Sequence, residues 1–184
     1  MAAGMPAGYC FLPDPDQVAT AVLKNSTWAV LGLTLEIELF TQEHYKQAIA
    51  PDDNLSELYK DIFLFHWKVE TTHAIMDELE WPREDQKLTG EERDRSVDEL
   101  IGIVADIDSI LQAQSAADTD YFVKAGGASL SADDIELTRS GMLKAYRWQY
   151  IFSGVDHPRY QAAIGELITD AQAQRINAAL APLR

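Results

Sequence analysis

The run YKDIFLFHWKVETTHAIMDELE, residues 59–80, is the most informative part of the chain. Steps of three and four residues stay on one face of a helix, and here such steps join a set of mostly apolar side chains. The set is Tyr59, Ile62, His66, Val69, His73, Met76 and Glu80. Glu70 lies four residues after His66 and three before His73. The pattern predicts one amphipathic helix, with two imidazoles and a carboxylate on the face that points into the core.

The rest of the chain has the same helical period, and no segment alternates with the period of two that is typical of strands. Capping residues, prolines and glycines mark the helix ends: Ser26, Pro51, Asn54, Pro82, Thr89, Gly126, Gly127, Ser131, Ser153, Gly154, Pro158 and Thr169. They predict long helices over about 27–49, 54–81 and 131–152, a further long helix from 89 to about 116 or 122, and short helices over about 16–24, after 158 and after 169.

Four long helices with shorter ones at the ends predict an all-α fold built as a helical bundle. The expected division is an N-terminal arm and short helix over 1–25 and a four-helix bundle over 26–152. Short C-terminal helices over 153–184 are expected to pack on that bundle. At 184 residues, the chain is long enough to bury a core without covalent crosslinks.

The charge balance excludes several kinds of partner. The chain has 15 Lys and Arg against 30 Asp and Glu, which gives a net charge of −15. A chain this negative repels nucleic acid and anionic membrane surfaces. Cys10 is the single cysteine, and we find neither a secretory signal pattern nor an apolar run long enough to span a membrane. These features predict a cytoplasmic protein that binds neither nucleic acid nor membranes.

The Glu70 carboxylate suggests a metal. Burying an ionised carboxylate alone is very costly, so it needs a cation, a proton or a strong donor. Neutral imidazole together with carboxylate suits iron, manganese or zinc. The simpler alternative is that Glu70 bonds a buried Arg or Tyr and that no metal binds.

The preceding helix is expected to supply a further carboxylate. Glu38 continues an apolar line that comprises Leu31, Leu35 and Tyr45. Glu36 shares a more polar line with Gly32 and Glu43. We therefore expect Glu38 to point inward and Glu36 to face solvent. His44 is a further candidate ligand on this helix.

A helix with an inward Glu, followed by a helix with Glu70-Thr-Thr-His73, resembles the first half of a ferritin-like diiron-carboxylate bundle. In that superfamily two helices each supply one Glu, and the other two each supply Glu-x-x-His. The resemblance covers roughly residues 26–152. It implies that Glu38, Glu70 and His73 hold one or two ions of iron, or of manganese or zinc.

The second half of the chain departs from the ferritin-like pattern. On the third long helix we expect Asp106 to be the inward carboxylate, because it lies between Ile103 and Ile110. The fourth long helix carries Lys144 and Arg147 where the ferritin-like pattern expects Glu-x-x-His. Protonated Lys and Arg nitrogens are poor metal ligands.

Three arrangements remain open for the incomplete site. His66 substitutes for the missing histidine, or Lys144 or Arg147 reaches inward and neutralises Glu70, or the site holds a single ion.

The leading hypothesis is a ferritin-like metal-binding protein, an iron-dependent oxidoreductase that activates oxygen or peroxide. Its metal ligands would be Glu38, His66, Glu70, His73 and Asp106. The alternative is a helical bundle without metal that acts as a binding or scaffold protein. We also expect a homodimer that associates along a long helix.

Overall fold

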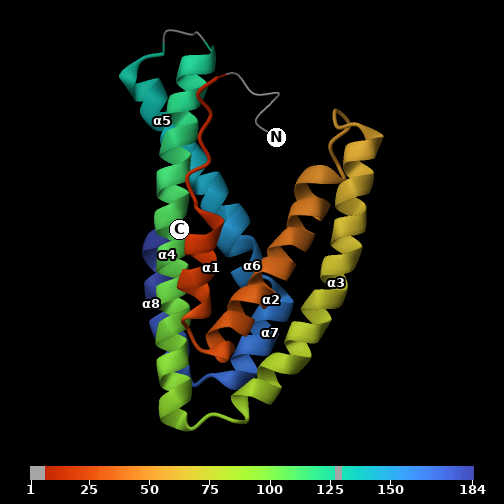
Figure 1. Ribbon diagram of the computed structural model, residues 1–184, viewed down its shortest axis with the longest axis vertical. Helices are drawn as coiled ribbons and strands as arrows, with labels where there is room; N and C mark the ends of the chain where they lie inside the picture. The colour runs from red at the N-terminus through yellow and green to blue at the C-terminus, as the bar shows by residue number, and fades with distance from the viewer. Residues whose placement is uncertain (1–6, 127–129) are drawn as a thin grey trace.

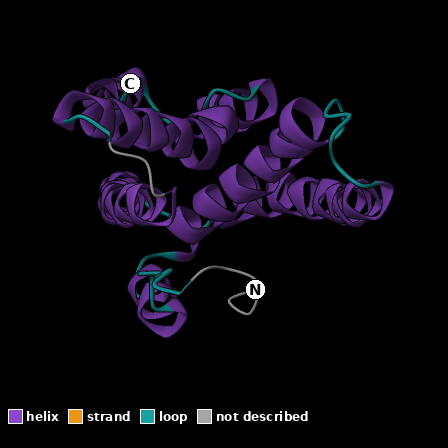
Figure 2. Ribbon diagram, turned by 90° about the horizontal axis from the view of Figure 1, so that it is seen from above, coloured by secondary structure: helices purple, strands orange, loops and turns teal. Residues whose placement is uncertain are grey.

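The structure is a computed structural model that describes residues 7–126 and 130–184. Within these residues it contains helices and connecting loops only (Figure 2), which confirms the all-α prediction. The α-helices are α1 (Pro15–Leu23), α2 (Thr27–His44), α3 (Glu57–Asp85), α4 (Gly90–Gly126), α5 (Ala132–Arg147), α6 (Ser153–Val155), α7 (Pro158–Leu167) and α8 (Asp170–Leu180). Two π-helical turns, η2 (Tyr45–Ile49) and η3 (Trp148–Phe152), extend α2 and α5, and a 3₁₀ turn, η4 (Ala181–Leu183), follows α8. The predicted chain break at Gly127 lies outside the described residues.

Helix ends follow the local capping chemistry. Ser131 and Thr169 each form a reciprocal capping box with the residue three positions later, as the sequence predicts. The bounds of α3 differ from the prediction at both ends. Ser56 rather than Asn54 caps its start, and the helix continues through Pro82 to Asp85. Proline is tolerated there because Trp81 and Asp85, on either side of it, are buried and hold this last turn in place.

Helix α2 lies at the centre of the molecule. It packs along α3 on one side and contacts α4, α6 and α7 on others, whereas α5 and α8 pack on α4. Helices α3 and α4 are joined by a short loop at one end of the molecule and diverge from there, so that the Glu57 end of α3 lies far from α4 (Figure 1). None of the described helices is both long and apolar enough to cross a membrane.

Buried aromatic side chains pack α2 against α3 at the end of α3 that is connected to α4. Trp28 and Trp81 are fully buried with their ring centroids 5.0 Å apart. The Trp28 indole donates to Asp85, which also accepts two hydrogen bonds from Arg93 of α4. A Cβ atom on Gly32 would lie 2.7 Å from the Trp81 ring, so the glycine permits the close approach of the two helices.

The predicted orientation of α3 is wrong. Ile62, Val69 and Met76, which we expected to face the core, are 58%, 51% and 55% exposed. The buried side chains of α3 are Ala74, Trp81 and Asp85, on the side that packs against α2. The apolar stripe stays exposed because α3 packs mainly on α2 through a different side, and α4 diverges from α3 (Figure 1).

Candidate metal centre

Three of the predicted ligands meet where α2 packs on α3. Glu38 of α2 and Glu70 and His73 of α3 each place one donor atom so that all three atoms lie within 4.8 Å of one another. The Nδ1 atom of His73 is 2.8 Å from a Glu70 oxygen and 3.7 Å from a Glu38 oxygen. The expectation that Glu38 approaches Glu70 and His73 is therefore confirmed in the structure.

His66 adds a fourth polar group to this cluster. Its Nδ1 atom lies 2.8 Å from the other Glu70 oxygen, so each oxygen of that carboxylate contacts one imidazole. The carboxylates of Glu38 and Glu70 are only 16% and 12% exposed, whereas both imidazoles are about half exposed. The cluster thus has a shielded carboxylate side and an imidazole side that is open to the surroundings.

The two carboxyl groups lie close enough to influence each other's ionisation. Burial, a hydrogen bond with Glu70 and the Glu70 charge raise the pKa of Glu38 to about 8. Burial also acts to raise the pKa of Glu70, but hydrogen bonds with Glu38 and His73 and the nearby imidazoles outweigh it, and the pKa is lowered. Without a metal, Glu38 carries the proton of the pair at neutral pH and Glu70 carries the charge.

Two further side chains support the cluster. Gln42 is buried, and its amide nitrogen donates to the backbone oxygens of Glu38 and Glu70, which ties α2 to α3 at this level. Asp77 lies one turn after His73, accepts a hydrogen bond from Thr34 and has its pKa raised by burial. Our sequence reasoning missed Asp77, although its position seven residues after Glu70 places it on the same face.

The donor set fits a single transition-metal ion. Nitrogen and oxygen ligands lie about 2.0–2.2 Å from a metal such as zinc, so two ligands of one tetrahedral ion are about 3.5 Å apart. The 3.7 Å distance from His73 to Glu38 is close to that value, whereas the 2.8 Å distance from His73 to Glu70 is that of a hydrogen bond, which a bound ion would have to replace. Carboxylate and imidazole together suit iron, manganese and zinc.

The inward acid of α4 is Asp108 and not Asp106, which corrects the prediction. Asp106 is exposed and does not join the cluster of Glu38, Glu70 and His73. Asp108 is buried, and Arg147 donates two hydrogen bonds to it, at 2.6 and 3.0 Å. Arg147 therefore neutralises Asp108 rather than Glu70.

Lys144 is exposed, so it does not reach into the core. His44, the other histidine proposed from the sequence, lies with its Nδ1 atom 2.8 Å from the Gln149 side chain of η3. Neither residue joins the cluster at Glu70.

The expectation that Glu36 is solvated is also wrong. Its side chain is buried against Gly154 of α6, where a Cβ atom would lie 2.4 Å from a Glu36 carboxyl oxygen. That oxygen has no hydrogen-bond partner among the described residues. Burial raises the pKa of Glu36 well above its usual range, so the group is held as the neutral acid. The polar line of α2 is covered because glycine lets α6 approach closely.

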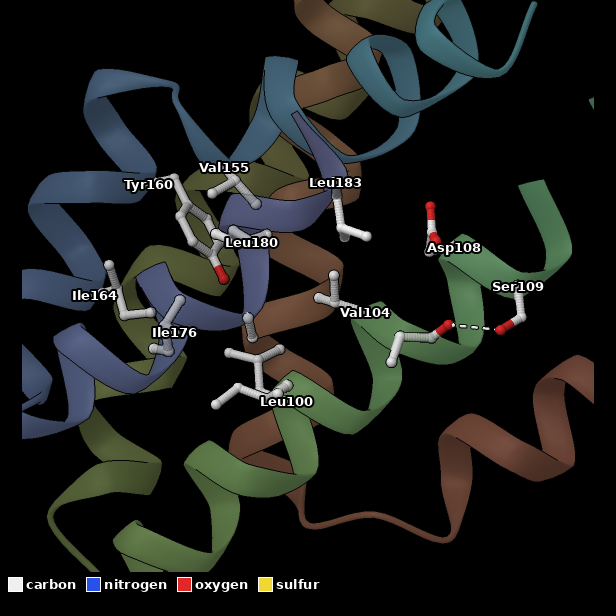
Figure 3. A pocket seen from close by; sticks show the side chains of 13 residues that line it. Leu100, Val104, Asp108, Ser109, Val155, Tyr160, Ile164, Ile176, Leu180 and Leu183 are labelled. Carbon is white, nitrogen blue, oxygen red and sulfur yellow. Dashed lines mark hydrogen bonds between the residues drawn. The ribbon is translucent and has the colours of Figure 1, made fainter. Parts of the chain in front are cut away.

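A separate cavity of about 280 Å³ lies between α4, α7 and α8 (Figure 3). Its wall is almost entirely apolar and includes Leu100, Val104, Val155, Ile164, Ile176 and Leu180. The Asp108 carboxylate at its edge is already bound by Arg147. The cavity therefore lacks the converging polar groups that orient a ligand.

Comparison of the chain with protein-family models, curated proteins and solved structures finds no significant match.

Proposed function

We propose that the protein binds a transition-metal ion through Glu38, Glu70 and His73, with His66 as an additional ligand. The observation that carries the proposal is the convergence of carboxylate and imidazole donors from two helices to within 4.8 Å. Two carboxyl groups this close disfavour ionisation of both, and a cation between them would favour the ionised form of each.

Iron is the metal that we propose. The arrangement of one Glu on α2 and Glu-x-x-His on α3 is the half-motif of a ferritin-like carboxylate bundle, and we propose a relationship to that superfamily on this ground. Bound iron would supply redox chemistry toward oxygen or peroxide. The chain would contribute the two carboxylates that hold the ion, the imidazoles that complete its coordination, and Gln42, which keeps α2 and α3 in register.

The competing proposal is a helical protein without catalysis that binds another macromolecule. It is supported by the exposed apolar side of α3, which includes Ile62, Val69 and Met76. Metal analysis separates the two functions, because metal binding requires Glu70 and His73 to be intact and binding through the exposed side of α3 does not.

The test is to remove metals from the purified protein, reload it with Fe²⁺ without oxygen, and measure bound metal by elemental analysis after dialysis. We expect about one ion per chain for the wild type and at least a tenfold loss of affinity for Glu70→Ala and His73→Ala. Glu80→Ala is the matched control, because Glu80 lies on the same helix but is half exposed and pairs with Arg83. A wild type that retains no stoichiometric iron, manganese or zinc would refute the proposal.

A further inference from the structure

A second cavity, of about 420 Å³, lies between the N-terminal arm (residues 7–14) and the helices α1, α2, α4 and α5. Its wall is mostly apolar and includes Val22 of α1, Leu33 and Ile37 of α2, and Ile107 and Ile110 of α4. A volume and a wall of this kind are typical of sites that bind small molecules. Unlike the cavity between α4, α7 and α8, this one is also lined by several polar side chains. We call it the arm cavity.

The arm is fixed to α4 and forms one wall of the cavity (Figure 1). The buried side chain of Gln114 accepts a hydrogen bond from the Leu12 amide at 2.9 Å and donates one to the Cys10 backbone oxygen at 3.2 Å. The ring of Tyr9 packs edge-on against Tyr121 of α4, with the ring centroids 5.4 Å apart. These contacts hold the arm over a cavity that would otherwise be an open groove.

Asp118 of α4 is a half-buried acid in the wall of the arm cavity. Among the described residues its side-chain hydrogen-bond partners are Tyr146 and Gln114, which each donate to a different carboxyl oxygen. A carboxylate has about four lone-pair sites, so this one can accept further donors. Asp108 on the same helix is bound by Arg147, whereas no Lys, Arg or His lines the arm cavity. Asp118 therefore lacks the cation that Asp108 has.

Aromatic rings lie around this carboxylate. Tyr9, Tyr146 and Tyr150 all line the arm cavity together with Asp118, and the rings of Tyr146 and Tyr150 are 6.0 Å apart in an edge-on arrangement. Burial, and then the neighbouring Asp118, raise the pKa of both Tyr9 and Tyr146, so these phenols stay uncharged. The faces of aromatic rings attract ammonium groups, most strongly where water is excluded. A carboxylate among such rings favours a cationic ligand.

The rest of the arm cavity disfavours an anion. Its second carboxyl group is Glu36, whose buried Oε1 atom has no hydrogen-bond partner among the described residues. Two carboxyl groups without a basic side chain would repel a carboxylate or a phosphate. The net charge of −15 also attracts cations to the molecule and repels anions.

We propose that the arm cavity binds a small amphipathic amine, with its ammonium group at Asp118 among the three tyrosine rings and its apolar body between α2 and α4. The ammonium group would donate to the lone pairs of Asp118 that Tyr146 and Gln114 leave free. The apolar body would cover side chains such as Leu33 and Ile107. None of the proposed metal ligands lines this cavity, so the amine site does not depend on the metal-binding function.

The experiment is isothermal titration calorimetry on the full chain at neutral pH and physiological salt, with octylamine as the probe. Octanol and octanoate have the same chain length but are uncharged and anionic. We expect one octylamine to bind per chain, at least tenfold more tightly than octanol, and octanoate to show no measurable binding.

Two variants locate the site. Asp118→Asn removes the charge but keeps an oxygen that can accept from Tyr146, so octylamine should bind at least tenfold more weakly while octanol is unaffected. Asp120→Asn is the matched control, because Asp120 lies on the same helix with its side chain 73% exposed, and it should leave both affinities unchanged. Ile107→Trp places a larger side chain in the arm cavity and should abolish the binding of both probes. Circular dichroism checks that each variant is folded.

Each alternative result contradicts the proposal in a different way. Equal affinity for octylamine and octanol, unchanged in Asp118→Asn, would show an apolar cavity without recognition of a cation. Octylamine binding that Asp120→Asn weakens as much as Asp118→Asn does, or that persists in a folded Ile107→Trp, would show only attraction to the acidic surface. Absence of octylamine binding to the wild type would refute the site altogether.

Discussion

Arg147 forms the best-shielded ion pair that joins α5 to α4. Its guanidinium donates to both oxygens of Asp108, and the two side chains are only 19% and 6% exposed. We predict that Arg147→Ala lowers the free energy of unfolding by about 3 kcal/mol, because it leaves a buried carboxylate without a partner. Urea unfolding at neutral pH measures the loss.

Arg139 on the same helix provides the matched control. It pairs with Asp120 and Glu136, both of which are mostly exposed, and such pairs contribute about 0–1 kcal/mol. If Arg139→Ala and Arg147→Ala lower the free energy of unfolding by the same amount, the ion pair between Asp108 and Arg147 has no special structural role.

Helical periodicity predicts the positions of some candidate ligands and not of others. The cluster of His66, Glu70 and His73 is predictable, because Glu70 lies about one turn from each histidine on the same helix. Helical periodicity does not decide which of Glu36 and Glu38 is buried. Both lie on α2, and Glu36 is buried only because Gly154 lets a distant segment approach. Periodicity alone contains no information about that approach.

Among the elements, α6 provides the sharpest test of close packing. A Cβ atom on Gly154 would lie 2.4 Å from the Glu36 carboxyl group and 2.5 Å from its backbone oxygen. The Gly154 backbone is helical, so alanine suits it and only the added contact is unfavourable. We predict that Gly154→Ala lowers the free energy of unfolding by about 1–3 kcal/mol, measured by thermal or urea unfolding.

Gly141→Ala is the control for this substitution. Gly141 lies inside α5 with nothing within 4 Å of the added Cβ position, so alanine should raise the stability by about 0.5–1 kcal/mol. A stabilising Gly154→Ala would show that α6 and α2 are less closely packed than the structure indicates.

For the whole molecule, the divergence of α3 from α4 predicts uneven stability along α3. The buried side chains of α3 lie in its second half, at Ala74, Trp81 and Asp85, next to the aromatic core. Local opening is easiest where few apolar side chains are buried. We predict that amides in 57–70 exchange with solvent at least tenfold faster than those in 74–85, measured by hydrogen exchange with a chelator present.

Helix α2 is the internal reference for this gradient. Its buried residues are spread along its length, from Trp28 to Gln42, so we expect no comparable gradient along it. Equal protection of both halves of α3 would contradict the description of its Glu57 end as weakly held.

The local chemistry of the chain was enough to predict the helices and to bring His66, Glu70 and His73 together on α3. Capping residues act within one turn, and neighbours at three and four positions share a face whatever packs around them. Thr169 and the pair Glu70 and His73 are examples.

Contacts between distant segments determined the rest. They cover Glu36 with α6, pair Asp108 with Arg147 and leave Asp106 in solvent. They also turn the apolar stripe of α3 outward. Hydrophobic periodicity reports which residues share a face, but the identity of the partner that covers the face depends on how helices far apart in the chain meet.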